Sequence, residues 1–278
     1  MAIPMILGTG TSITTMAEAG AGAESRLRLF QLVSPALPVG GFSYSEGLEV
    51  LVQDGRLGGA PELEAWLRAE LVRGAVALET AALSGLRQQL RRWREAALVG
   101  SSAPAAAEPG AGSAGAAWAA VRDLDGWLLA QREAAEVRAQ QRQMGSSLLQ
   151  LLADLGFPLP AAEPAAAGAA APVAAASAPA LAWPGAFAWA SCCLELDSPA
   201  IEEAYLYAWV ANQISAAVRL VPLGPTQGQR LQLALAPLIA SRAAELAAAD
   251  PRDLWSAGVG AALAQLRHAE LYSRLFRS

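Results

Sequence analysis

The sequence predicts an all-α protein, folded as a single-domain helical bundle, on three observations. Apolar residues recur at helical spacing over most of the chain. Alternating β-branched runs and Asn-Gly hairpin turns, which indicate strands, are nearly absent. Two long segments rich in Ala, Pro and Gly interrupt the pattern, and such segments are typical of disordered inserts. We expect the domain to span residues 25–278, after a disordered tail of residues 1–24.

The first helices of the domain have recognisable starts. Ser43 and Glu46 have the spacing of a capping box, which predicts a helix through Leu51. Pro61 is expected at the first position of the next helix, whose apolar residues keep helical spacing to Leu71.

A long helical pattern occupies the middle of the chain, from Trp118 to Leu155, and stops at Gly156. The inserts flank it at about 100–117 and 160–182. The uncharged run from Pro164 to Leu194 contains four prolines and mostly Ala, which favours a linker over a bilayer span.

Ser198–Pro199 is expected to cap the next helix. This helix has no charged residue from Ala204 to Val218, and a helix that is apolar almost all round is buried on all sides. Tyr207, Val210 and Ile214 are therefore expected in the core or at a dimer interface.

Two further helices complete the prediction. Thr226 and Gln229 have capping-box spacing at the start of one, and Pro237 should kink it. Asp250–Pro251 is expected to open the last helix.

Composition excludes several functions. The chain has 278 residues and a net charge of −5, which gives no basic patch for nucleic acid. It contains no Lys, so it cannot be a P-loop GTPase or ATPase, because that loop needs a Lys to reach the terminal phosphates. The first Arg is Arg26, so the N-terminus lacks the basic region of a secretory signal. We expect a soluble cytoplasmic protein.

Metal and cofactor binding are also not expected. Cys192 and Cys193 are adjacent, and bridging neighbours is strained, so they are expected to be reduced, buried thiols. With His268 as the single His and no metal-ligand spacing, a metal site within one chain is not expected. A site shared across a dimer axis stays open as an alternative.

Two sequence matches to enzyme motifs lack the required context. Gly110–Gly115 matches Gly-x-Gly-x-x-Gly, but it lies in an insert instead of between a strand and a helix. Gly41–Ser45 approaches the nucleophile elbow but lacks the second Gly and a preceding strand. The protein is therefore not expected to be an enzyme.

The segment from Ser34 to Glu49, "SPALPVGGFSYSEGLE", is expected to form an entry loop built from prolines and glycines. Its local sequence does not explain why Phe42 and Tyr44 should lie at an exposed loop tip.

The C-terminal segment "RHAELYSRLFRS" is rich in aromatic residues and Arg, which are enriched where interfaces concentrate binding energy. On a helix, Arg267, Leu271 and Arg274 would share one side, with Leu275 and Phe276 as apolar anchors. A final helix that only packs on the core is the alternative.

Several blocks, in the same order along the chain, resemble the UreF family of urease accessory proteins. They are "LFQLVSPALPVGGFSYSEGLE", "RQMGSSLLQL", "AYLYAWVANQISAAVRLVPLG", "GQRL" and "LRHAELYSRLFRS". The resemblance implies an all-α, non-catalytic protein that dimerises, binds the accessory protein UreD (also called UreH) and recruits the GTPase UreG. That assembly helps deliver nickel to the urease apoprotein.

The resemblance also implies which residues bind the partner: Phe42, Tyr44, Glu46, Arg267, His268, Tyr272, Arg274, Leu275 and Phe276. Arg274 is expected to donate to backbone carbonyls near Phe42. A helical adaptor of an unrelated complex is the alternative function.

Overall fold

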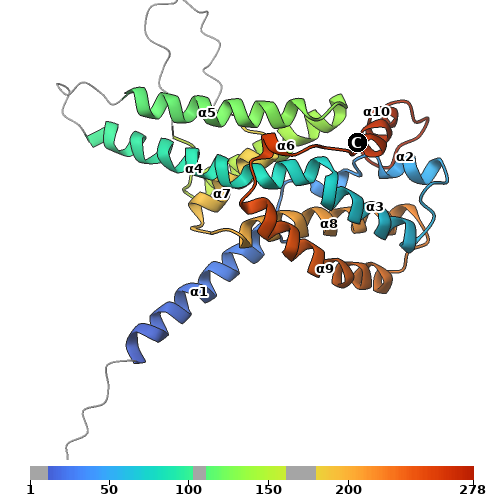
Figure 1. The fold of residues 1–278 in the computed structure, drawn as a ribbon, viewed down its shortest axis with the longest axis horizontal. Helices are drawn as coiled ribbons and strands as arrows, with labels where there is room; N and C mark the ends of the chain where they lie inside the picture. The colour runs from blue at the N-terminus through green and yellow to red at the C-terminus, as the bar shows by residue number, and fades with distance from the viewer. Residues whose placement is uncertain (1–11, 103–110, 161–179) are drawn as a thin grey trace, which may run out of the picture.

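The computed structural model describes residues 12–102, 111–160 and 180–278, and these residues form helices and connections without a strand (Figure 1). The expected all-α class is confirmed for this part of the chain. Short 3-10 helices lie at η1, Gly41–Ser43, and η2, Pro251–Asp253. The α-helices are α1 Ser12–Leu32, α2 Leu48–Gln53, α3 Ala60–Arg73, α4 Ala75–Ser102, α5 Ala111–Ala130, α6 Ala135–Asp154, α7 Trp183–Cys193, α8 Ala200–Leu220, α9 Pro225–Ala247 and α10 Val259–His268.

The centre of the bundle is α4. It packs against α3, α5, α7, α8 and α9. Leu83, Leu86 and Leu90 of α4 are fully buried, and their spacing by three and four residues places them on one face. The long amphipathic helix therefore supplies the core that the other helices cover.

The helix buried on all sides is α7. Every residue from Pro184 to Cys193 is buried, although this stretch belongs to the uncharged run interpreted as a linker. Small residues permit the burial, because backbones approach closely there. A Cβ on Gly145 of α6 would lie 2.2 Å from the carbonyl oxygen of Leu181. Composition alone wrongly indicated a linker here, because Ala and Gly are common both in linkers and in tightly packed helices.

The packed part of the chain also takes in parts of both expected inserts. Residues 103–110 and 161–179 lie outside the described residues. Within the first insert, α5 begins at Ala111 and Ala117 is buried. At the end of the second, Leu181 and Ala182 are buried. Ala is the best helix former, so an Ala-rich stretch folds where a neighbouring helix covers it.

The expected helix from Trp118 to Leu155 is in fact two helices. The chain leaves the helical path after Ala130 and resumes it at Ala135. In the connection, the buried Arg132 guanidinium donates to Glu79 Oε1 of α4 at 2.6 and 2.8 Å. An Arg placed on the polar side of a continuous helix would not make this inward contact.

The N-terminal segment also departs from expectation, because α1 begins at Ser12, inside the expected tail. Residues 1–11 lie outside the described residues. Figure 1 shows α1 extending away from the bundle, which it meets only near its end. Leu27 and Phe30 are exposed on α1.

Helix α8, whose residues 204–218 carry no charge, is buried on one side only. Val210 and Ile214 belong to the core, whereas Tyr207 is 43% exposed. Two of the three residues expected in the core or at a dimer interface are therefore core residues of this chain.

Several helix starts differ from the predicted caps. The helix expected from Ser43 begins at Leu48, after Gly47. At α9, the N–H of Gly224 donates to the Gln227 side chain at 3.1 Å, so the capping pair lies two residues earlier than predicted. Asp250 caps only the short η2, because the last α-helix begins later in the chain.

No helix in the described ranges combines the length and apolar character needed to cross a membrane.

Candidate functional site: the opening loop and the C-terminal tail

The opening loop, residues 34–47, is a series of tight turns fixed by its glycines. Gly40 and Gly47 have φ of 73° and 87°, a conformation in which a side chain is strained. A Cβ on Gly47 would also lie 2.9 Å from the backbone nitrogen of Gln265 in α10. The glycine pattern thus lets α10 press directly against the loop.

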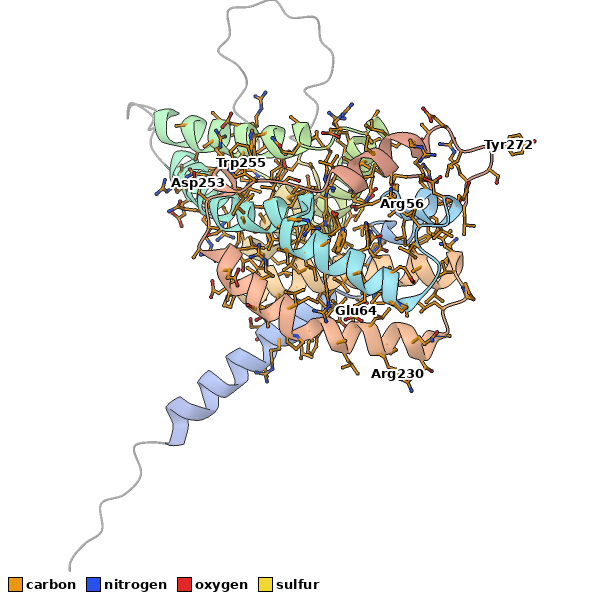
Figure 2. All side chains as sticks on the ribbon, turned by 45° about the vertical axis from the view of Figure 1, so that its right-hand side comes forward. Arg56, Glu64, Arg230, Asp253, Trp255 and Tyr272 are labelled. Atoms are coloured by element: carbon orange, nitrogen blue, oxygen red, sulfur yellow. The ribbon has the colours of Figure 1, made fainter. Side chains whose placement is uncertain are left out.

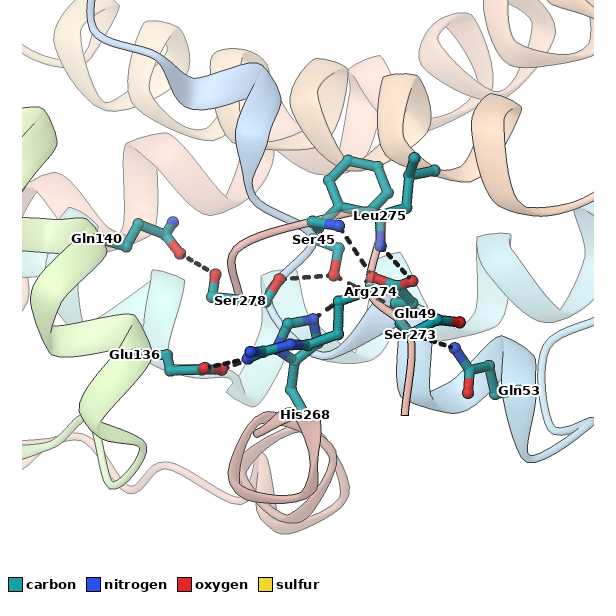
Figure 3. Close-up of polar contacts among 11 residues, drawn as sticks. Ser45, Glu49, Gln53, Glu136, Gln140, His268, Ser273, Arg274, Leu275 and Ser278 are labelled. Atoms are coloured by element: carbon teal, nitrogen blue, oxygen red, sulfur yellow. Dashed lines mark hydrogen bonds and ion pairs between the residues drawn. The ribbon is translucent and has the colours of Figure 1, made fainter. Parts of the chain in front are cut away.

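The C-terminal tail, residues 269–278, is not helical. Since α10 ends at His268, the expected helical face of Arg267, Leu271 and Arg274 does not form. The tail instead runs back beside the opening loop (Figure 3).

Backbone hydrogen bonds join this tail to the loop. The backbone oxygen of Ser278 accepts from the N–H groups of Ser45 and Glu46 at 2.8 and 3.1 Å. It also accepts from the Ser45 hydroxyl at 2.7 Å. The N–H of Arg277 donates to the Ser43 carbonyl at 2.9 Å. Two segments far apart in sequence therefore form one unit.

One buried carboxylate, that of Glu49, anchors the backbone of the tail. Glu49 of α2 accepts from the N–H of Leu275 at 2.8 Å and from that of Phe276 at 3.1 Å. The ring nitrogen Nε2 of His268 lies 3.4 Å from the same carboxylate. Hydrogen bonds to an ionised acceptor are about twice as strong as neutral ones, so Glu49 is the main anchor of the tail.

A second carboxylate, Glu136 of α6, links the tail to the bundle. His268 Nδ1 lies 2.7 Å from Glu136 Oε2, and Arg274 donates to Oε1 at 2.6 Å. The expectation that Arg274 donates to carbonyls near Phe42 is therefore wrong. Arg219 of α8 has that role instead, donating to the Phe42 carbonyl at 3.2 Å.

Arg219 also reaches the tail, because its guanidinium lies 4.5 Å from the ring centre of Phe276. A cation over an aromatic face is favourable by roughly 0.5–1 kcal/mol at an exposed site. Arg219 of α8 thus contacts both the loop and the tail, and the sequence analysis did not identify it.

The nine expected partner-binding residues divide into two groups. Buried within the chain are Tyr44, Glu46, His268 and Phe276. Tyr44 is only 5% exposed, so it is not at an exposed loop tip. Available to a partner are Phe42, Arg267, Tyr272, Arg274 and Leu275, which we call the exposed tail–loop residues.

Of these residues, Tyr272 is fully exposed and Phe42 is 68% exposed. Figure 2 shows Tyr272 at the outer edge of the molecule, pointing away from the bundle. Exposed apolar side chains that lie together are typical of an interaction surface.

Glu46 belongs to a buried polar network below the loop. It accepts from Gln140 at 2.9 Å and from the Trp209 indole at 3.3 Å, and its carboxylate lies 3.6 Å from Arg132. The residues of this network that the sequence analysis missed are Glu79, Arg132, Gln140, Gln141 and Tyr205.

Burial raises the pKa of Glu79, against the opposing effect of Arg132. A cavity of about 230 Å³ lies above this network, between the opening loop and α8. The polar network shapes the floor of that cavity and fixes the position of the loop.

The geometry gives no support to hydrolase chemistry at the loop. Both ring nitrogens of His268 face carboxylates, and the Ser45 hydroxyl is engaged with Ser278. Burial raises the pKa of Cys193 to about 12, and that of Cys192 is also raised, so both stay thiols. No group of three potential metal ligands suited to an ion occurs among the described residues.

The amino-acid sequence is clearly related to that of a known protein family. The family model named UreF matches residues 58–236. The chain belongs to the UreF family.

Relatives named "Urease accessory protein UreF" align over nearly the whole chain. The protein from Synechocystis sp. is 36% identical over 265 residues, 92% of this chain and 98% of that protein. The protein from Alkalilimnicola ehrlichii is 36% identical over 90% of this chain and 95% of its own. A Prochlorococcus marinus relative is 31% identical over 92% of this chain and 100% of its own.

Proposed function

We propose that the protein is a non-catalytic scaffold in urease maturation, which binds a UreD/UreH-type accessory protein and recruits a UreG-type GTPase to the urease apoprotein. Membership of the UreF family supports the role in urease maturation. The single structural observation that carries the finer proposal is the attachment of the tail to the opening loop by Ser278 and Glu49.

This attachment makes the tail suitable for docking. The N–H groups of Leu275, Phe276 and Arg277 and the oxygen of Ser278 are already hydrogen-bonded within the chain, so this end of the tail needs little further ordering when a partner arrives. Pre-organisation of this kind raises affinity, because less conformational entropy is lost on binding. Tyr272 and Leu275 would be the apolar anchors, with Arg274 beside them.

In this proposal, the partners carry out the chemical steps of urease maturation. The chain has no Lys for a P-loop, so GTP hydrolysis belongs to the UreG-type protein. In this proposal nickel is cargo of the assembly, and the protein works in the cytoplasm without nucleic acid, membrane or a cofactor of its own.

A homodimer is part of the proposal. Val210 and Ile214 are occupied in the core, which leaves Tyr207 as the residue of that trio available to a second copy.

The test is co-expression with a UreD-type partner and a UreG-type GTPase, followed by pull-down and size-exclusion chromatography. A complex of all three supports the scaffold. Failure of the intact chain to retain the UreD-type partner would contradict it.

A further inference from the structure

A second cavity, of about 210 Å³, lies on another part of the molecule, where α3 and the connection before it meet the first turn of α10. It is smaller than the roughly 300 Å³ at which drug-sized sites begin, so it suits a ligand of a few heavy atoms. Its lining combines apolar residues with the charged side chains of Arg56, Glu62, Glu70 and Arg73.

The deepest charged group is Glu70, which is 9% exposed. Its side chain forms no hydrogen bond or ion pair with any residue that the structure describes. Buried polar groups are nearly always paired with protein, water or ligand, so an unpaired carboxylate facing a cavity requires an explanation.

The backbone around this carboxylate is shaped to hold it. A Cβ on Gly74 would lie 2.2 Å from Glu70 Oε2, and one on Gly258 would lie 3.6 Å from both oxygens. The N–H of Ala257 donates to the Arg73 carbonyl at 2.9 Å, which ties the two glycine-containing segments together. These glycines leave the space that the carboxylate occupies.

The cavity also offers donors. Arg56 and Arg73 line the cavity and are exposed, and neither side chain forms an ion pair in the described part of the chain. The carboxylate of Glu70 therefore lies deep in the cavity, and the guanidinium groups of Arg56 and Arg73 lie at its mouth.

We propose that this cavity binds a small zwitterion of the amino-acid class, whose ammonium group donates to Glu70 and whose carboxylate accepts from Arg56 and Arg73. Such a ligand supplies the missing partner for the buried carboxylate and joins the unpaired cations at the mouth. Bidentate contact of Arg with a carboxylate adds geometric specificity. Because the cavity spans α3 and α10, the ligand braces the helix that carries the tail.

Isothermal titration calorimetry of the intact protein at pH 7 tests the proposal with three probes that share the alanine side chain and differ in which charged groups they carry. L-alanine has both charges, L-alaninamide has only the cation, and N-acetyl-L-alanine has only the anion. We expect L-alanine to bind at least ten-fold more tightly than either of the others.

Two variants locate the site. Glu70→Gln and Arg73→Gln should each weaken L-alanine binding at least ten-fold, whereas the matched control Glu64→Gln should not change it. Glu64 lies on the same helix but pairs with Arg68. Circular dichroism and thermal melts establish that each variant is folded.

Two results would overturn the proposal: no L-alanine binding by the folded wild type up to about 10 mM, beyond the millimolar affinity range, or equal binding of L-alaninamide. Neither result bears on the scaffold proposal, which is tested with protein partners.

Discussion

The backbone oxygen of Ser278 accepts hydrogen bonds from both the N–H and the hydroxyl of Ser45, at 2.8 and 2.7 Å. This contact joins positions 233 residues apart in the sequence. It makes the opening loop and the tail one structural unit, so a substitution in either segment should alter the structure or stability of the other.

Glu49→Gln should release the tail without unfolding the bundle. The neutral amide accepts hydrogen bonds more weakly, and its NH₂ group would face the N–H groups of Leu275 and Phe276. Loss of charge-assisted hydrogen bonds costs about 1.5–3 kcal/mol each. Hydrogen–deuterium exchange should show faster exchange in residues 271–278 alone.

The control for that experiment is Gln53→Ala, which removes only the long 3.5 Å contact with Ser273. Equal protection of the tail in Glu49→Gln and the wild type would mean that Glu49 does not anchor it.

Substitutions on α8 should separate core from surface. Val210→Asp places an unpaired charge in a fully buried site and should destabilise the protein by more than about 4 kcal/mol or make it insoluble. Tyr207→Asp should change the free energy of unfolding by less than about 1 kcal/mol, since this residue is partly exposed.

Chemical denaturation measures both variants. Size-exclusion chromatography of Tyr207→Asp adds a test of the dimer, because a charge at a shared interface should give a monomer. An unchanged elution volume of Tyr207→Asp would place any dimer contact elsewhere, and wild-type stability of Val210→Asp would contradict the core assignment.

Glu70 should make stability fall as the pH rises toward neutrality. Burial raises its pKa from 4.5 to about 7, with Arg132 and Arg73 opposing and Glu46 adding to the shift. The folded state therefore holds a proton between these values that the unfolded state has lost, so this contribution to stability is present at low pH and lost by pH 8.

Glu70→Gln removes that dependence. The variant should be more stable than the wild type by about 2–3 kcal/mol at pH 8 and nearly equal to it at pH 5, as measured by urea unfolding. The exposed Glu62→Gln serves as the control. A Glu70→Gln variant less stable than the wild type at pH 8 would show that the ionised carboxylate is stabilising.

Arg274→Ala should leave the fold intact but weaken partner binding. Its ion pair with Glu136 is partly exposed and should contribute less than about 1 kcal/mol to folding. At an interface that excludes water, truncation of a paired charge can cost about 2–5 kcal/mol. Thermal melts and pull-down of a UreD-type partner measure the two effects separately, and a large loss of melting temperature would mean that Arg274 is structural.

Much of the fold could be predicted from the sequence, because helical periodicity is local. The apolar series ending at Leu71 and the core positions Val210 and Ile214 are where the pattern indicates. The sequence did not reveal α7, since its Ala-rich composition has the same appearance in a linker as in a tightly packed helix.

The site was harder to predict, because its contacts join distant segments through groups that have no periodicity. The sequence drew attention to the loop and the tail, which the structure joins by backbone hydrogen bonds. It could not indicate that Tyr44 is buried or that Glu49 and Glu136 hold the tail. The glycines of the loop were a local signal, because Gly adopts φ > 0 without strain, as Gly40 and Gly47 do in the structure.

The most direct test of the scaffold is the affinity for a purified UreD-type partner of a chain with Tyr272→Ala and Leu275→Ala combined. These side chains are exposed, so the variant should fold normally. Leu233→Ala, which changes an exposed leucine on α9, is the control. Biolayer interferometry should give at least a hundred-fold weaker binding for the double variant, about 2.7 kcal/mol, and wild-type binding for the control. Wild-type affinity of the folded double variant would contradict docking through the tail.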